Sequence, residues 1–324
     1  MQKYKDTAKS EARFIEVKPS RARVSAFCVS AFLRFRVWAE MVKLSHSVFA
    51  LPFALTATFL AGRAIEGRGR PYGGQLALIV LCMVAARSVA MTFNRIVDAE
   101  IDARNPRTAG RPLPAEKLTR IAAYAMLVLA AITFGFGCLG FHVFYDNTWP
   151  ILLSGPVLAY LCGYSFTKRF TQWSHFYLGS SIALSPVAAW LAIHPATLGV
   201  EAFLLMVVVT CWIGGFDILY ACQDVDIDRR DGLFSLPARL GVAQALWIVR
   251  ASHLTAVVGL VLLGVFARLG IIYAIGVAFA AALLMVENVL VRTTDLRRVN
   301  LAFSLNGGVS VLLAIAAITD VLVR

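Results

Sequence analysis

Two stretches of the chain place aspartates four residues apart, where an apolar segment gives way to a polar one. An α-helix turns by about 100° per residue, so side chains three, four and seven positions apart share one face. The side chains that share such a face are Arg87, Asn94, Asp98 and Asp102 in the first stretch, and Asp217, Tyr220, Asp224 and Asp228 in the second. Glu100 and Asp226 fall well off these faces, and we expect both to be solvated.

Paired carboxylates of this kind are unfavourable unless a cation offsets their charge. Like charges four residues apart destabilise a helix, and a negative charge at a helix C-terminus opposes the helix dipole. Donor sets made of oxygen favour a hard cation, above all Mg²⁺. Two Mg²⁺ ions would balance the four charges, and a diphosphate could bridge the metals. The carboxylates concerned are Asp98, Asp102, Asp224 and Asp228.

A diphosphate would also need basic side chains around it. Basic residues are abundant after both motifs, and Lys168 and Arg169 lie in a further polar loop. Most of these residues also serve as markers of the cytoplasmic side. Lys43 and Arg87 are stronger candidates, because a charge inside an apolar segment is costly and usually functional. For Arg87, an ion pair with Asp217 is an open structural alternative.

The composition excludes a soluble enzyme. Of 324 residues, 59% are hydrophobic and 15% charged, and the mean hydropathy is +0.72, whereas soluble domains are about 25% charged. An outer-membrane barrel would show alternating segments of about ten residues. The chain instead has nine apolar blocks of roughly the length that a helix needs to cross a bilayer. They are 41–62, 74–96, 119–141, 148–166, 174–194, 200–222, 242–266, 269–291 and 299–322. We expect an all-α membrane protein with nine transmembrane helices.

The charge distribution predicts the orientation in the membrane. The net charge is +12, and most of the 31 Lys and Arg residues fall in segments on one side, which is typical of the cytoplasmic side. We therefore expect a cytoplasmic N-terminus, a basic arm over 1–37, a membrane domain over 38–324 and no nucleic-acid partner. The loop with Arg63, Arg68 and Arg70 departs from this pattern. The second and sixth blocks both run toward the cytoplasm, so the two acidic motifs should meet at one face.

The motifs resemble those of a known superfamily. The first motif and the stretch that follows it, Asn105-Pro-Arg-Thr-Ala-Gly-Arg-Pro-Leu-Pro114, resemble the first signature of the UbiA superfamily of intramembrane prenyltransferases. The second motif resembles the second signature. The run Tyr164-Ser-Phe-Thr-Lys168-Arg169 is similar to the stretch between the fourth and fifth helices of that superfamily.

Within the superfamily, the 4-hydroxybenzoate polyprenyltransferases are the most similar group, on the run Lys43-Leu-Ser-His46. Two positions bear on the acceptor. The ubiquinone enzymes more often have proline where this chain has Ser165, and usually lysine where it has His46. Prenylation of 1,4-dihydroxy-6-naphthoate for menaquinone is therefore the alternative to 4-hydroxybenzoate.

The resemblance implies nine helices around a central cavity in the cytoplasmic (inner) membrane, open sideways to lipid. It implies a polyprenyl diphosphate donor, an aromatic acid acceptor and Mg²⁺ as cofactor. The implied ligands of Mg²⁺ and the donor diphosphate are Asn94, Asp98, Asp102, Asp224 and Asp228. The implied additional phosphate contacts are Lys43, Arg87, Lys168 and Arg169.

The chemistry expected of such a site is ionisation of the allylic C–O bond, followed by attack of an aromatic ring carbon. Asp217 or Tyr220 could then assist removal of the ring proton. A secondary transporter is the alternative from another class, because similar motifs in the second and sixth blocks suggest an internal repeat. Transporters, however, place ionisable residues near the bilayer midplane. Among the lone histidines, His175 is singled out by its place beside the Lys168 loop.

Overall fold

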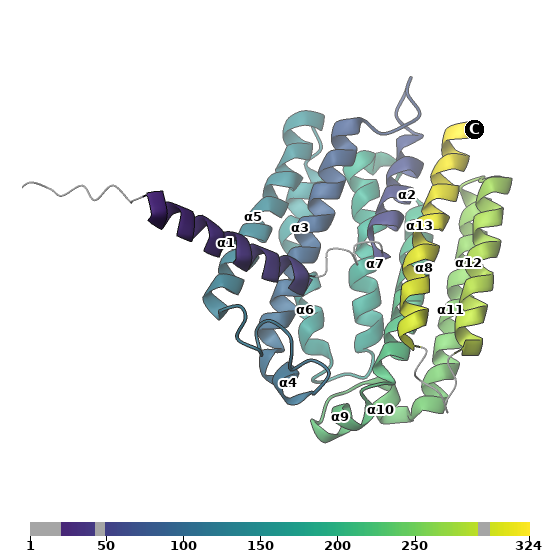
Figure 1. Cartoon of the computed structure of the whole chain (residues 1–324). Helices are drawn as coiled ribbons and strands as arrows, with labels where there is room; N and C mark the ends of the chain where they lie inside the picture. Colours follow the sequence, from purple (N-terminus) through teal and green to yellow (C-terminus); the bar gives the residue numbers. More distant parts are fainter. Residues whose placement is uncertain (1–20, 43–48, 291–298) are drawn as a thin grey trace, which may run out of the picture.

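The regular structure of the chain is helical in the computed structural model, which describes residues 21–42, 49–290 and 299–324 (Figure 1). Eight of its helices are long and apolar enough to cross a membrane, so the protein is a multi-pass membrane protein. They are α3 (Gly73–Val97), α5 (Arg120–Tyr145), α6 (Trp149–Thr167), α7 (Ser174–Ile193), α8 (Val200–Ala221), α11 (Val242–Phe266), α12 (Ile271–Leu290) and α13 (Val299–Val323).

The first predicted block, 41–62, differs from the other eight. Its helical part is α2 (Leu51–Gly62), an apolar helix of 12 residues that is shorter than a full span. Met41 and Val42 belong instead to α1 (Arg21–Val42), which runs across the predicted end of the arm at residue 37. The division into arm and membrane domain stays a prediction.

Three short helices lie together at one end of the bundle, opposite to the C-terminus (Figure 1). They are α4 (Ala99–Arg104), α9 (Val225–Arg230) and α10 (Leu236–Leu240). Because α4 follows α3 and α9 follows α8, both acidic motifs are at this end. A single turn of 3₁₀ helix, Pro195–Thr197, joins α7 to α8 at the other end.

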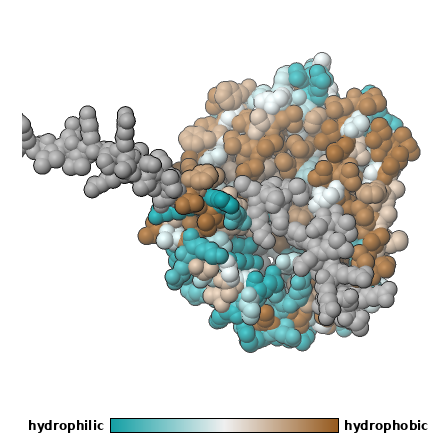
Figure 2. All heavy atoms as spheres, in the orientation of Figure 1, coloured by the Kyte–Doolittle hydropathy of each residue, from teal (hydrophilic) through white to brown (hydrophobic). Residues whose placement is uncertain are grey.

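The outer surface of the bundle is apolar where lipid would cover it. Large side chains that point outward include Phe136 on α5, Leu152 on α6 and Leu254 on α11. Figure 2 shows hydrophobic residues over much of the visible face of the bundle, with hydrophilic residues gathered at the end that carries α4 and α9. A soluble protein rarely exposes so continuous an apolar surface, so this face is suited to the bilayer interior.

Glycines bring α7 and α8 into close contact. A Cβ atom at Gly179 of α7 would collide with the backbone oxygen of Thr210, and one at Gly214 of α8 would meet the ring of Phe176 at 2.9 Å. Small residues at such positions let helix backbones approach closely, which is how membrane helices gain packing energy. This contact sets the distance between the start of α7 and the end of α8.

Arginines at the end away from the acidic motifs have structural partners. Arg63 Nη1 donates to the carbonyl of Ala267 at 2.7 Å, at the C-terminus of α11, and Arg68 stacks over the ring of Tyr72. Asp320 accepts the backbone N–H groups of Gly270 and Tyr273 at the start of α12. Cations are favourable near helix C-termini, so Arg63 departs from the charge pattern for a local reason.

We expect Gly179→Ala to lower the free energy of unfolding by about 1–3 kcal/mol, because the added methyl group overpacks the α7–α8 contact. Gly155→Ala is the matched control, because a Cβ at Gly155 of α6 meets no atom of the described residues within 4 Å. Unfolding in detergent micelles, followed by tryptophan fluorescence, measures both. Equal stability of the two variants would contradict the packing described for α7 and α8.

Candidate active site

A polar cavity of about 260 Å³ opens between the two acidic motifs. One wall comes from the end of α3, α4 and the loop that follows. The other comes from the end of α8, α9 and the segment before α10. The end of α6 and the start of α7 close the remaining sides. Its lining includes Asn94, Asp98, Asp102, Lys168, Asp217, Tyr220, Asp224 and Asp228.

The first aspartate of each pair lies where a spanning helix ends and a short helix begins. Asp98 separates α3 from α4, and Asp224 lies between α8 and α9. Neither motif therefore lies on one unbroken helix. Like charges four residues apart and the opposing helix dipole both disfavour continuation. Hydrogen bonds from Asp98 N–H to Asn94 O and from Asp102 N–H to Asp98 O nevertheless keep the helical spacing.

Asp98 is buried among donors from two elements, α3 and the loop after α6. Asn94 Nδ2 donates to its Oδ2 at 2.8 Å. Lys168 Nζ lies 2.9 Å from the same oxygen, and Arg169 Nη2 lies 3.3 Å from Oδ1. The loop after α6 thus brings two cations onto the first carboxylate of the motif. Their predicted contact with phosphate stays a prediction.

Asp102 is held by arginines. Arg111 Nη1 contacts both of its carboxylate oxygens at 2.7 Å, and Arg95 Nη1 lies 4.0 Å from Oδ2. Arg111 belongs to the stretch after the first motif, whose Thr108 hydroxyl donates to the backbone oxygen of Asp102. The loop therefore folds back over α4 and places its basic side chain in the cavity.

The same loop also reaches the second motif. Arg107 forms a two-pronged ion pair with Asp224 and donates from Nη1 to the hydroxyl of Tyr220 at 3.2 Å. Asn105 Nδ2 donates to Asp224 Oδ1 at 3.4 Å. Sequence reasoning named Arg107 and Arg111 only among many basic residues. Their membership in the signature stretch was the signal that could have singled them out.

Asp228 is bonded on the second wall. The hydroxyl of Ser235 donates to its Oδ2 at 2.7 Å. Burial raises the pKa of the Asp228 carboxyl above its ordinary value, and the charge of Asp224 adds to this against the effects of Ser235 and Lys168. Negative charge is thus crowded at this wall, which suits a cation.

Asp217 pairs with His175 rather than with Arg87. His175 Nδ1 lies 2.7 Å from Asp217 Oδ2, and both residues line the polar cavity. Sequence reasoning had singled out His175 by its position alone and gave it no partner.

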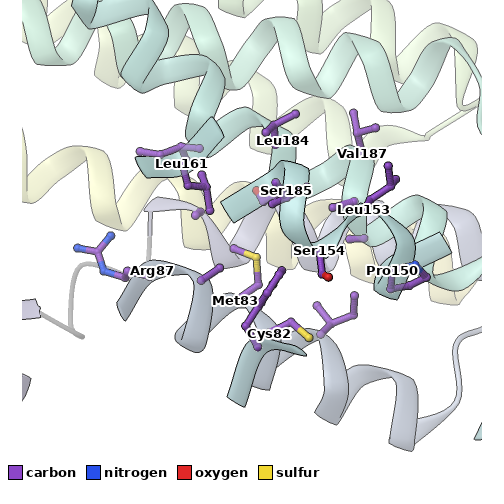
Figure 3. A pocket seen from close by; sticks show the side chains of 18 of the residues that line it. Cys82, Met83, Arg87, Pro150, Leu153, Ser154, Leu161, Leu184, Ser185 and Val187 are labelled. Atoms are coloured by element: carbon purple, nitrogen blue, oxygen red, sulfur yellow. The ribbon is translucent and has the colours of Figure 1, made fainter. Parts of the chain in front are cut away.

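Arg87 lines a second, apolar cavity of about 250 Å³. Figure 3 shows Arg87 at one end of this cavity, with Pro150 and Val187 toward the other. Tyr164 and Leu178 line both cavities, so the polar and apolar spaces adjoin at these two side chains.

Three further predicted positions complete the comparison. Glu100 and Asp226 are exposed, as their places off the helical faces predicted, and Glu100 pairs only loosely with Arg120, at 3.6 Å. Lys43 lies outside the described residues.

The oxygen ligands around the cavity form an open, incomplete set, which suits Mg²⁺, and not a closed metal site. Among the residues that the structure describes, no three His, Cys, Asp or Glu side chains converge as a preformed metal site. Mg²⁺ usually takes one or two carboxylates together with substrate phosphates and water. Two pairs of aspartates on opposite walls, with amide oxygens beside them, provide that incomplete ligand set.

Comparisons with known proteins give the family and the fold of the chain. The sequence profile of the UbiA prenyltransferase family matches residues 54–314. A 4-hydroxybenzoate octaprenyltransferase of Vibrio parahaemolyticus is 32% identical over 254 residues, which cover 78% of this chain and 86% of the relative. The apo structure of a UbiA homolog from Aeropyrum pernix is 28% identical, with a TM-score of 0.76 over 86% of this chain and 98% of that one.

A more distant structure shares the fold. It is a UbiA homolog from Archaeoglobus fulgidus bound to GPP and Mg²⁺, with 14% identity and a TM-score of 0.66. The superposition covers 88% of this chain and 99% of that chain.

We expect Asp98→Asn and Asp224→Asn each to weaken binding of a divalent cation in the presence of inorganic diphosphate by at least about tenfold, since each removes a negative charge from the lining of the polar cavity. Mn²⁺ as a paramagnetic probe measures this affinity. Glu100→Asn and Asp226→Asn are matched controls on the exposed faces and should bind as the unmodified protein does. If a control loses as much affinity as Asp98→Asn, the assignment of faces is wrong.

Proposed function

The chain belongs to the UbiA prenyltransferase family, and from this premise we propose that it transfers a polyprenyl chain from its diphosphate to a ring carbon of 4-hydroxybenzoate, in a Mg²⁺-dependent reaction of quinone biosynthesis. One observation carries the proposal: a cavity lined by carboxylates and cations adjoins an apolar cavity at Tyr164 and Leu178. A donor with a charged head and a hydrocarbon tail needs both.

The polar cavity would bind the diphosphate through metal and basic groups. The proposed Mg²⁺ ligands are Asn94, Asp98, Asp102, Asp224 and Asp228. When bound, Mg²⁺ withdraws charge from the diphosphate and so lowers the cost of breaking the allylic C–O bond. Three of these carboxylates contact basic side chains, namely Lys168, Arg169, Arg107 and Arg111. The positive charge of these side chains is therefore within reach of a diphosphate placed between the walls. The Mg²⁺ and GPP of the Archaeoglobus fulgidus homolog support this assignment.

The apolar cavity would hold the hydrocarbon tail. Its walls come from α3, α5, α6 and α7, and they shield the allylic cation from water, which would otherwise capture it. Arg87 lies at one end of this cavity (Figure 3), and we keep it as a proposed phosphate contact together with Lys43.

The acceptor reacts next to the polar cavity. A ring carbon ortho to the hydroxyl attacks the allylic cation, and the ring then loses a proton to restore aromaticity. Asp217 and Tyr220 remain the proposed proton acceptors. The carboxylate is the better base, since the Tyr220 hydroxyl already accepts a hydrogen bond from Arg107.

The names of the relatives favour 4-hydroxybenzoate over 1,4-dihydroxy-6-naphthoate. The transporter alternative loses support, because the two aspartate pairs belong to α4 and α9 and the residues directly before them. These short helices lie at one end of the bundle rather than at its middle (Figure 1). We further propose nine crossings with α2 as part of the first, a cytoplasmic N-terminus, and residence in the cytoplasmic (inner) membrane. The basic residues around the acidic motifs support this orientation.

We expect the purified protein with Mg²⁺ and a polyprenyl diphosphate to prenylate 4-hydroxybenzoate at the position ortho to the hydroxyl, and EDTA to stop the reaction. Mass spectrometry identifies the product, with 1,4-dihydroxy-6-naphthoate tested in parallel. Prenylated naphthoate alone would move the enzyme to menaquinone synthesis. EDTA-sensitive diphosphate release without either product would keep the donor assignment and overturn the acceptor.

We expect Leu153→Trp to lower kcat/KM for an octaprenyl diphosphate by about tenfold or more, since a larger side chain obstructs the tail cavity. Geranyl diphosphate, whose tail is short, should react as with the unmodified enzyme. The matched control is Leu152→Trp, because the side chain of Leu152, the neighbour of Leu153 in the sequence, is 64% exposed on the outer surface. Equal losses with both donors would show that Leu153 does not border the distal part of the tail.

A further inference from the structure

His175 of α7 and Asp217 of α8 form a hydrogen-bonded pair that lines the polar cavity. His175 Nδ1 lies 2.7 Å from Asp217 Oδ2, and the side chain of His175 is 5% exposed while that of Asp217 is 33% exposed. On its other side, His175 Nε2 accepts the backbone N–H of Leu236 at 3.3 Å. Both ring nitrogens are therefore engaged, and the carboxylate faces the cavity.

The hydrogen bonds define which nitrogen of His175 carries hydrogen. A backbone N–H can only donate, so Nε2 must present its lone pair to Leu236. In a neutral imidazole the hydrogen then resides on Nδ1, which donates to Asp217. The ring cannot turn over without breaking both bonds. Asp217 thus has one oxygen committed to His175, and among the described residues its Oδ1 has no hydrogen-bond partner.

The fold builds this pair from α7 and from the wall that carries the second acidic motif. His175 is the second residue of α7, and the contact at Gly214 sets α7 against α8, which carries Asp217. Leu236 begins α10, directly after Ser235, whose hydroxyl bonds Asp228. The orientation of Asp217 is thereby tied to the segment that also holds a proposed metal ligand.

We propose that His175 is a positioning residue for the loss of the ring proton. It orients Asp217 so that the free carboxylate oxygen faces the acceptor ring. This inference rests on the proposed function. After the new C–C bond forms, the C–H electron pair returns to the ring and the proton passes to Asp217 Oδ1. The carboxyl then releases the proton to water in the cavity, and His175 keeps its Nδ1 hydrogen throughout.

Two substitutions separate the two bonds of the imidazole. The side-chain amide of His175→Asn occupies the place of Nδ1 and can still donate to Asp217. In His175→Gln the amide reaches the place of Nε2 and can still accept from Leu236, but the donor to Asp217 is lost. His142→Gln is the matched control, since His142 is exposed in the last turn of α5, at the end of the bundle away from the polar cavity.

Two reactions are measured for each variant. The first is prenylation of 4-hydroxybenzoate, compared with prenylation of the same acid carrying deuterium at both ring positions ortho to the hydroxyl. The second is Mg²⁺-dependent release of diphosphate in the absence of an acceptor. We expect His175→Gln to lower kcat by about 10²-fold through misplacement of the base, to increase the deuterium isotope effect, and to leave diphosphate release intact. His175→Asn should restore kcat toward that of the control.

Three results would overturn the inference. The first is a His175→Gln enzyme as fast as the control. The second is a slow one with no increase in the isotope effect, or with diphosphate release reduced in proportion, which would indicate a structural role. The third is a His175→Asn enzyme that gel filtration shows to be folded but whose kcat is no higher than that of His175→Gln. If the unmodified enzyme releases diphosphate but prenylates neither acceptor, the proposed function fails first and the inference with it.

Discussion

Four aspartates at the end of an apolar bundle impose the constraint on which the rest of the site depends. Carboxylates this close repel one another and lose hydration, so they persist only where cations surround them. Two loops supply those cations. Arg107 and Arg111 come from the loop after α4, and Lys168 and Arg169 come from the loop after α6. The loops fold over the bundle end because their charges are drawn to the aspartates.

The same constraint explains the break in both acidic helices. Asp98 and Asp224 lie where the chain leaves the apolar layer, and each ends a long helix and precedes a short one. The spanning helices bring the motifs to one end, and the short helices orient the second carboxylate of each pair toward the cavity. Close packing of α7 and α8 then places a fifth carboxylate, that of Asp217 with its bond to His175, beside the four aspartates.

Helical periodicity was sufficient to place Asp98 and Asp102 on the cavity side and Glu100 outside, because backbone bonds keep the spacing across the break. Amino-acid pattern alone could not pair His175 with Asp217, since that contact depends on how two helices pack. Apolar composition did not separate Met41 and Val42, which end α1, from the residues of α2, since an apolar run alone does not mark where one helix ends and the next begins. The partner of Arg63 likewise belongs to a helix end far along the chain.

The meeting of the two cavities at Tyr164 and Leu178 has an evolutionary consequence. Side chains that set the reacting head and side chains that set the tail space come from different parts of the bundle. Mutations such as those at Leu153 can therefore accumulate without disturbing the carboxylates. Lineages built on this architecture can diversify the lipid length of their products while the chemistry stays under separate, stricter selection.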